Sequence, residues 1–365
     1  MSHSVFQWLK SLLSAMCALV LSLLIISGIA SFLKIFSDDF NGFDFSDVYM
    51  HVGDRRSVAE LSNDVVIVSI DECSREGISH VIDAMKYLSP AAVGLDIFFL
   101  YSSAEGEELI NSIKACNNIV LPIALDKEFF GSYFYDEIDA EYGVVNIMSS
   151  SSFDVVRDYV TLFNTDSTKY LSMPMALIQK SGKTQFQSSS DLKHIWYPSI
   201  DIEVIEADEL VDEYGNPDFS YVDKIKGKIV LIGTVRDPSD MHRTPIKEEM
   251  PGTMIHGHII DTILHNRHIR DIGMFWNILI AFIVSLLFIR LHLFLKDKLD
   301  DIGEILMRGI QLFLIYSFLI IGVNLYLKHS IFIDFSITMM MLFLCIAILN
   351  LINGVFFLWE KIRHC

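Results

Sequence analysis

The stretch Gly227–Arg270 decides the fold, and it reads GKIVLIGTVRDPSDMHRTPIKEEMPGTMIHGHIIDTILHNRHIR. Its first part, Lys228–Gly233, is a short apolar run between glycines, which is typical of a buried strand. A polar loop follows and ends at Pro251-Gly252. From Thr253 onward the apolar residues recur with helical spacing. This part of the chain therefore predicts a strand, a loop and a helix that leads directly to a hydrophobic segment.

The composition of the whole chain indicates a membrane protein. Of its 365 residues 52% are hydrophobic, and the mean hydropathy is +0.41. A helix needs about 20 apolar residues to cross a bilayer, and residues 11–33 carry no charge over that length. Further hydrophobic segments cover 274–295, 306–327 and 331–359. We therefore expect four transmembrane helices, one N-terminal and three C-terminal, although the first could instead be a removed signal peptide.

The distribution of charge predicts an orientation. Lysines and arginines lie before the first segment, around the connection between the second and third, and after the last. The positive-inside rule then places residues 1–10 and 360–365 in the cytoplasm and residues 34–273 outside it, in a multi-pass membrane protein. From Ile35 to Gly273 there are 40 acidic and 19 basic residues, a net charge of 19 − 40 = −21. Such a domain is not expected to bind nucleic acid.

The extracytoplasmic domain alternates apolar runs with helical patterns. Strands are expected at Asp64–Ile70, Ala91–Phe99 and Asn118–Ala124, with helices at Ile78–Leu88 and Glu107–Ala115 between them. This alternation predicts an α/β domain with a mostly parallel sheet and flanking helices. The remaining part is less regular, with strands expected at Tyr142–Ile147, Tyr159–Phe163 and Ile200–Ile205 and a helix at Pro174–Lys180.

Four aspartates follow predicted strands. Asp71 and Asp96 come at the ends of two strands that we expect to be neighbours, and Asp237 and Asp240 follow the strand 228–233. Ligands of open α/β sheets bind at the carboxyl ends of the strands. These aspartates are therefore candidates for binding a polar or cationic ligand, together with two hydroxyl residues, Ser74 and Thr244.

Other interpretations of these residues stay open. The oxygen ligands would also suit a divalent cation, and Asp71 and Asp96 could simply cap the following helices. His256 and His258 are two positions apart on a helix, which does not favour joint metal ligation, so we expect them on its polar face. We find no nucleophile elbow, phosphate-binding glycine loop or spaced His-Cys cluster, and we assign no catalytic residue.

Several stretches together resemble the CHASE type 2 (CHASE2) family of extracytoplasmic sensor domains. They are VVIVSIDECS (65–74), AAVGLDIFF (91–99), NNIVLPIAL (117–125), YGVVNI (142–147), GKIVLIGT (227–234), and Asp240–Pro245 followed by MPG (250–252). The resemblance also adds Arg157 to the candidate ligand-binding residues, because it matches the arginine of the family's Asp-Gly-x-x-Arg turn. The Asp-Gly pair of that turn does not match.

The resemblance implies a sensor role in a bacterial inner membrane. We expect a membrane-anchored sensor module without an output domain, which binds a small ligand or a cation and relays its state to a separate signalling partner. The family resemblance also allows a homodimer. A structural or assembly subunit of a membrane complex is the alternative, and a metal-dependent hydrolase is a third hypothesis.

Overall fold

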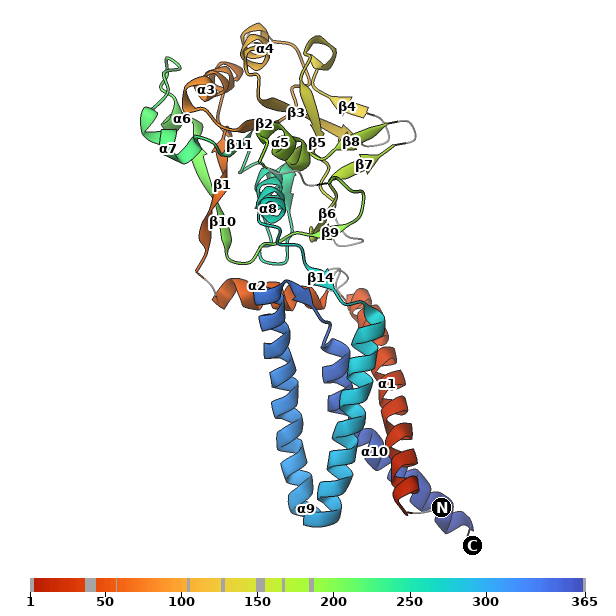
Figure 1. Cartoon of the computed structure of the whole chain (residues 1–365). Coiled ribbons are helices and arrows are strands. Elements are labelled where there is room, and N and C mark those ends of the chain that lie inside the picture. Colours follow the sequence, from red (N-terminus) through yellow and green to blue (C-terminus); the bar gives the residue numbers. More distant parts are fainter. Residues whose placement is uncertain are drawn as a thin grey trace. The chain divides into compact units, whose positions relative to one another are not determined.

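The computed structural model describes residues 3–36, 44–56, 58–103, 106–125, 129–148, 155–165, 168–183 and 187–363. The chain divides into two compact units. The helical unit comprises Met1–Val52 and Ile269–Cys365, and the α/β domain comprises Gly53–His268. Figure 1 labels the elements of both units.

A seven-stranded sheet forms the centre of the α/β domain. β11 (Ile229–Gly233) is its central strand and pairs in parallel with β1 (Glu60–Ser69) on one side and with β2 (Ala92–Asp96) on the other. β10 (Ile200–Glu206), β3 (Ile119–Leu125) and β5 (Glu141–Val144) extend the sheet in parallel, and β4 (Phe129–Gly131) pairs antiparallel with β3. The prediction of a mostly parallel sheet is therefore confirmed.

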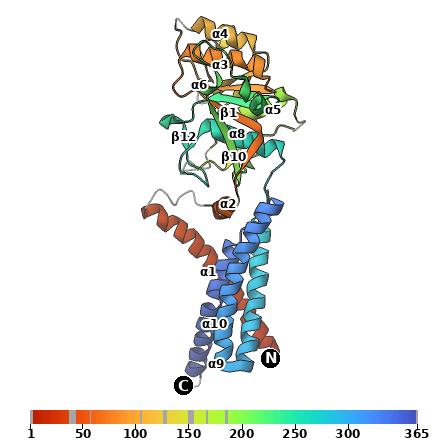
Figure 2. The same ribbon diagram turned by 90° about the vertical axis from the view of Figure 1, so that its left-hand side faces the viewer.

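Helices cover both faces of this sheet, which explains its uninterrupted apolar strands. All five residues of β11 are buried. On one face α3 (Arg75–Leu88) and α4 (Gly106–Ala115) lie side by side and share a hydrophobic core with β1, β2 and β11 (Figures 1 and 2). α5 (Met173–Ser181) and α8 (Gly252–Leu264) also pack on the sheet. α5 approaches so closely that a Cβ added to Gly94 would lie 2.8 Å from the Leu177 side chain.

The remaining elements of the domain are short. The prediction of a single strand at Tyr159–Phe163 is wrong, because two strands of different sheets occupy this region. β6 (Asp158–Tyr159) pairs with β9 (Lys193–His194), and β7 (Leu162–Asn164) forms a hairpin with β8 (Lys169–Leu171). The others are η2 (Tyr135–Glu137), α6 (Ala207–Leu210), η3 (Phe219–Tyr221), α7 (Val222–Ile225), η4 (Pro238–Asp240), β12 (Met241–His242) and β13 (Met250–Pro251).

The helical unit contains α1 (His3–Phe36), the first part of α2 (Phe45–Arg56), α9 (Met274–His329) and α10 (Ser336–Arg363). It also contains two short strands, β14 (Arg270–Asp271) and β15 (Ile331–Phe332), which pair in parallel. Side chains of α1, α9 and α10 share one hydrophobic cluster, which includes Ala15, Phe288 and Met341.

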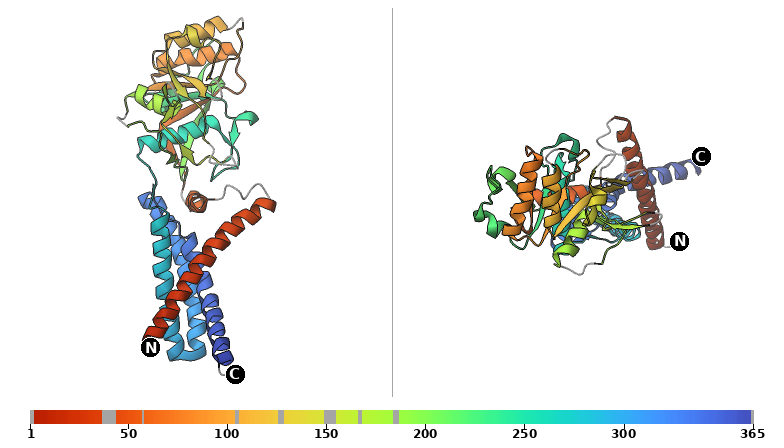
Figure 3. Two further views of the ribbon diagram at one scale, coloured as in Figure 1. Left: turned by 90° about the vertical axis from the view of Figure 1, so that its right-hand side faces the viewer. Right: turned by 90° about the horizontal axis from the view of Figure 1, so that it is seen from above.

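The expectation of four separate transmembrane helices needs a correction. Within the described part of the chain, three helices are long and apolar enough to cross a membrane, at Gln7–Ile26, Met274–His329 and Ser336–Trp359. The predicted segments 274–295 and 306–327 both lie in α9, because the polar connection between them is helical up to Asp300, where φ is 47° and ψ is −127°. α9 folds back on itself near that residue and so forms two arms (Figures 1 and 3).

Candidate functional site

The carboxyl ends of β1, β11 and β2 form the edge of the sheet at which the sequence placed a ligand site. Ser69, Gly233 and Asp96 are aligned across the three strands. The expectation that Asp71 and Asp96 follow neighbouring strands is wrong, because β11 lies between β1 and β2. The two aspartates therefore lie on opposite sides of β11 and have different partners.

Asp71 holds the loop that follows β11. Its carboxylate accepts hydrogen bonds from the backbone N–H groups of Val235 (3.0 Å) and Arg236 (2.9 Å). The Ser69 hydroxyl lies 2.9 Å from Asp71 and 2.7 Å from Glu206, which forms an ion pair with the Arg236 side chain. Because one hydroxyl proton serves only one acceptor at a time, Ser69 can donate to one of the two carboxylates, while Arg236 pairs with Glu206. The sequence did not single out Glu206, which ends β10.

Asp96 is joined to the start of α8. The Thr253 hydroxyl donates a hydrogen bond of 2.8 Å to the Asp96 carboxylate. Burial raises the pKa of Asp96, and the nearby His256 and the bond from Thr253 oppose this shift. Gly233 permits the close approach, since a Cβ at this position would lie 2.5 Å from Thr253 Oγ1.

Asp240 reaches the same turn of α8 from the preceding loop. Its Oδ2 accepts a hydrogen bond of 3.2 Å from the backbone N–H of Gly252, the first residue of the helix. Its Oδ1 lies 3.3 Å from Nε2 of His242. A carboxylate is favoured at this end of a helix because the first N–H groups are unpaired and carry partial positive charge. Asp96 and Asp240 thus converge on the first turn of α8.

The other predicted residues hold local structure. Ser74 caps α3 by accepting a hydrogen bond of 3.1 Å from the Gly77 N–H. Asp237 caps the 3-10 turn 238–240, and the bonds from Ser239 lower its pKa. The Thr244 hydroxyl donates to the carbonyl of Lys247 at 3.1 Å. These three contacts position loops and helix ends around the edge of the sheet.

Arg157 is buried, with 5% of its surface exposed. It belongs to a segment that supports the loop after Asp240, because the Val156 N–H donates to the carbonyl of Arg243 at 2.8 Å. Its own carbonyl accepts a bond of 2.8 Å from the Ile195 N–H. The structure therefore connects Arg157 to the β12 region through the main chain.

The histidines of α8 contradict the sequence interpretation. His256 and His258 are 3% and 2% exposed, so neither lies on a solvated polar face. The prediction failed because α8 is covered on several sides, and the ring of Tyr197 meets His258 in an edge-to-face contact with centroids 5.1 Å apart. Burial lowers the pKa of His258 to about 3, so it is neutral at physiological pH. His256 Nδ1 has no hydrogen-bond partner among the residues that the structure describes, and this residue adds a buried polar group beside Asp96.

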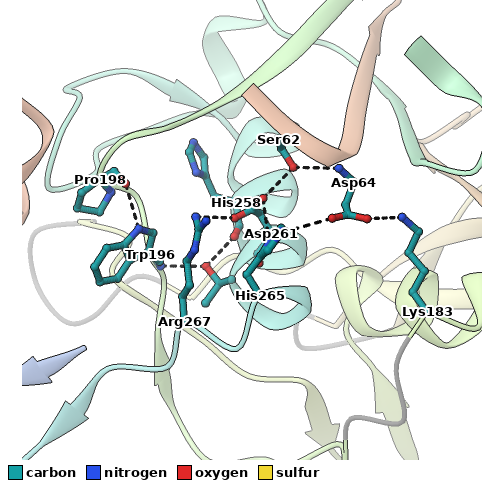
Figure 4. A network of polar contacts seen from close by, with 10 residues as sticks. Ser62, Asp64, Lys183, Trp196, Pro198, His258, Asp261, His265 and Arg267 are labelled. Carbon is teal, nitrogen blue, oxygen red and sulfur yellow. Dashed lines mark hydrogen bonds and ion pairs between the residues drawn. The ribbon is translucent and has the colours of Figure 1, made fainter. Parts of the chain in front are cut away.

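A second polar cluster lies at the other end of α8 (Figure 4). Asp261 is 1% exposed and accepts hydrogen bonds from the Ser62 hydroxyl (2.8 Å) and from Nη1 of Arg267 (3.1 Å). His265 connects this carboxylate to β1, because its Nδ1 lies 3.3 Å from Asp261 and its Nε2 lies 3.5 Å from Asp64. The polar pair at positions 261 and 265, one helical turn apart in an apolar helix, was the available sequence signal.

Two hollows in the described part of the α/β domain are lined by none of the seven predicted residues, and His256 lines one of them. An open hollow of about 670 Å³ is lined by β7, β8 and residues 187–193, and it contains none of the seven predicted residues. Among the described residues no group of three or more His, Cys, Asp or Glu side chains is placed to hold a metal ion. The cation interpretation of the aspartates therefore gains no support from the geometry.

Comparison of the chain with curated proteins and with solved structures gave no match. A family model for the CHASE2 domain matches residues 17–291, which is 275 of the 365 residues. The match includes the complete parallel sheet, the aspartates at its carboxyl edge and α8. The chain belongs to the CHASE2 domain family.

Proposed function

We propose that the protein is a membrane-anchored sensor module. CHASE2 is a family of sensor domains, and three helices of the chain are apolar and long enough to span a membrane. In this proposal the α/β domain lies outside the cytoplasm and both termini lie inside, as the basic residues near the hydrophobic segments favour. A separate protein reads the state of the spans.

The ligand of this proposal is a small polar or cationic solute that binds near the first turn of α8. The observation that carries it is the convergence of Asp96 and Asp240 on that turn from two different elements. Nδ1 of the buried His256 beside Asp96 finds no partner in the described part of the chain, and an unpaired buried polar group is costly unless a partner is gained. Since the chain continues from α8 to α9, a change at this turn has a covalent route to the helical unit.

The test is ligand-dependent stability of the full-length chain in detergent. Thermal unfolding is followed with amino acids, dicarboxylates, polyamines, sugars and divalent cations. A ligand present at a hundred times its dissociation constant stabilises the folded state by about 2.7 kcal/mol. We expect one class to do so, and the effect to disappear in Asp96→Asn and Asp240→Asn but to persist in the control Asp223→Asn, which alters an exposed residue.

A structural or assembly subunit is the second candidate. The observation that favours it is the internal bonding of the aspartates, because backbone N–H groups of the loop after β11 engage Asp71 and the Ser239 N–H of its own loop engages Asp237. No stabilisation by any ligand class, together with full function of the aspartate variants in the cell, would support this candidate and contradict the sensor proposal.

A further inference from the structure

Tyr49 fixes α2 to the helical unit. Its side chain is fully buried and packs against Tyr326 and Phe332, with ring centroids 6.0 and 5.7 Å away. Its hydroxyl donates a hydrogen bond of 3.0 Å to the carbonyl of Ile333. Burial raises the pKa of Tyr49, so the hydroxyl stays a donor at physiological pH. α2 is thus bound to the turn that connects α9 to α10.

Gly322 makes the packing of the Tyr49 side chain possible. It lies in the second arm of α9, and a Cβ added there would overlap the Tyr49 hydroxyl and lie 2.5 Å from its ring carbon Cζ. A tyrosine side chain packed against the backbone of a helix cannot retreat without leaving its aromatic neighbours. The glycine is therefore required by the contact.

The other connection of the α/β domain ends on the same turn. β14 follows α8 in the chain and pairs with β15, which lies between α9 and α10. The Arg270 N–H donates to the Ser330 carbonyl at 2.7 Å, and the Ile272 N–H donates to the Phe332 carbonyl at 3.3 Å. These bonds join the segment that leaves the domain to the residues that Tyr49 contacts.

The turn itself is built into both neighbouring helices. Ser330 ends α9 in a left-handed conformation with φ of 52°, and its N–H bonds to the carbonyls of the last helical turn. Asp334 accepts a hydrogen bond of 2.9 Å from the Ser336 N–H at the start of α10. Because each end of the turn is fixed to a helix, a displacement of the turn moves both helices.

We propose that the turn Ser330–Phe335 is a shared anchor for both chain connections of the α/β domain. A movement of α2 or of β14 is passed through this anchor to the second arm of α9 and to α10. The first arm of α9, which follows β14 directly, is then only one of the routes into the spans. This inference rests on the proposed sensor function for its purpose, while the coupling itself requires no ligand.

The test is hydrogen exchange of the full-length chain in lipid nanodiscs, without ligand. Gly322→Ala forces the Tyr49 side chain out of its packed position. Gly309→Ala is the matched control, because a Cβ at Gly309 in the same helix meets nothing within 4 Å. If the anchor is shared, Gly322→Ala raises exchange about tenfold both in α2 and in residues 269–272. Gly309→Ala leaves both segments unchanged.

Tyr49→Phe is the milder variant to use if Gly322→Ala loosens the whole helical unit. Tyr49→Phe removes only the hydroxyl bond to Ile333 and is expected to raise exchange in both segments about fivefold. Faster exchange confined to α2, with residues 269–272 as protected as before, would overturn the shared anchor. Unchanged exchange of α2 in both variants would show that Tyr49 does not hold α2 to the helical unit. Neither result bears on ligand binding, which the stability assay tests separately.

Discussion

Replacing Asp261 by Asn tests whether the buried carboxylate stabilises the end of α8 through its charge. Asn has the same shape but one acceptor and one donor group. The guanidinium of Arg267 cannot accept a hydrogen bond, so the amide oxygen must face it, and the amide N–H₂ then faces Ser62. The hydroxyl of Ser62 can accept this bond, but its own hydrogen then loses the acceptor that Asp261 provides.

The cost of the substitution therefore comes mainly from Ser62. A hydrogen bond to a charged group contributes about 1.5–3 kcal/mol, whereas a neutral bond contributes about 0.5–1.5 kcal/mol. The Ser62 bond becomes neutral and loses about 1 kcal/mol, and the buried Ser62 hydroxyl hydrogen loses its acceptor, which costs about 1 kcal/mol more. The Arg267 bond keeps its charged donor, and the partly exposed Arg267 and His265, at 29% and 36%, add little beyond this. We expect the free energy of unfolding of the α/β domain to fall by about 2 kcal/mol.

Trp196 provides the local probe for this measurement. Its backbone N–H donates to the Thr262 hydroxyl at 3.0 Å, beside the altered residue. The other three tryptophans of the chain, Trp8, Trp276 and Trp359, are replaced by Phe, and urea unfolding is followed by fluorescence. The exposed control Asp223→Asn should stay within about 0.5 kcal/mol of the parent chain. If Asp261→Asn also stays within that range, the charge of Asp261 contributes nothing and the reasoning is wrong.

Three further substitutions follow from the same structure. Burial lowers the pKa of His258 from 6.5 in the unfolded chain to about 3 in the folded one, so the unfolded state binds more protons between these two pH values. The free energy of unfolding should therefore fall by up to about 1.4 kcal/mol per pH unit as the pH drops through this window. His258→Phe should remove that slope in unfolding curves recorded from pH 7 to 4, and an unchanged slope would contradict the assignment. Gly233→Ala forces a methyl group against Thr253 and should destabilise the domain by about 1–3 kcal/mol in urea unfolding. Its control Gly77→Ala, which meets only ordinary contacts in α3, should be neutral or stabilising, and equal effects of the two would refute the steric argument. Ser74→Ala removes the cap of α3 and should cost about 1 kcal/mol, which the same unfolding assay would reveal or exclude.

The sequence predicted the elements of the α/β domain better than their arrangement. β11 and α8 were predictable because a continuous apolar run and a helical spacing are local signals. The position of β11 between β1 and β2 was not, because it depends on pairing between strands far apart in the chain. The same holds for Asp71, whose main partner Val235 is 164 residues away.

The burial of individual side chains also could not be predicted from the local sequence pattern. His256 and His258 look polar in the sequence, yet packing on several sides of α8 buries both. For the candidate site, the convergence of Asp96 and Asp240 agrees with the expected position at the carboxyl edge of the sheet, while Ser74 and Asp237 were named for binding and are observed as caps. A residue type at a strand end cannot distinguish these roles, because a capping and a ligand-binding aspartate have the same sequence signal.

The two ends of α8 place opposite demands on their carboxylates. At the first turn Asp240 faces the partial positive charge of free N–H groups, so the helix itself stabilises it. In the last turn Asp261 lies at the negative end of the helix dipole, which disfavours a buried carboxylate unless cations compensate it. Arg267 and His265 supply that compensation because the chain turns back after the helix. The last turn of α8 thus depends on the cationic side chains that follow it, whereas at the first turn the backbone N–H of Gly252 itself binds the carboxylate of Asp240.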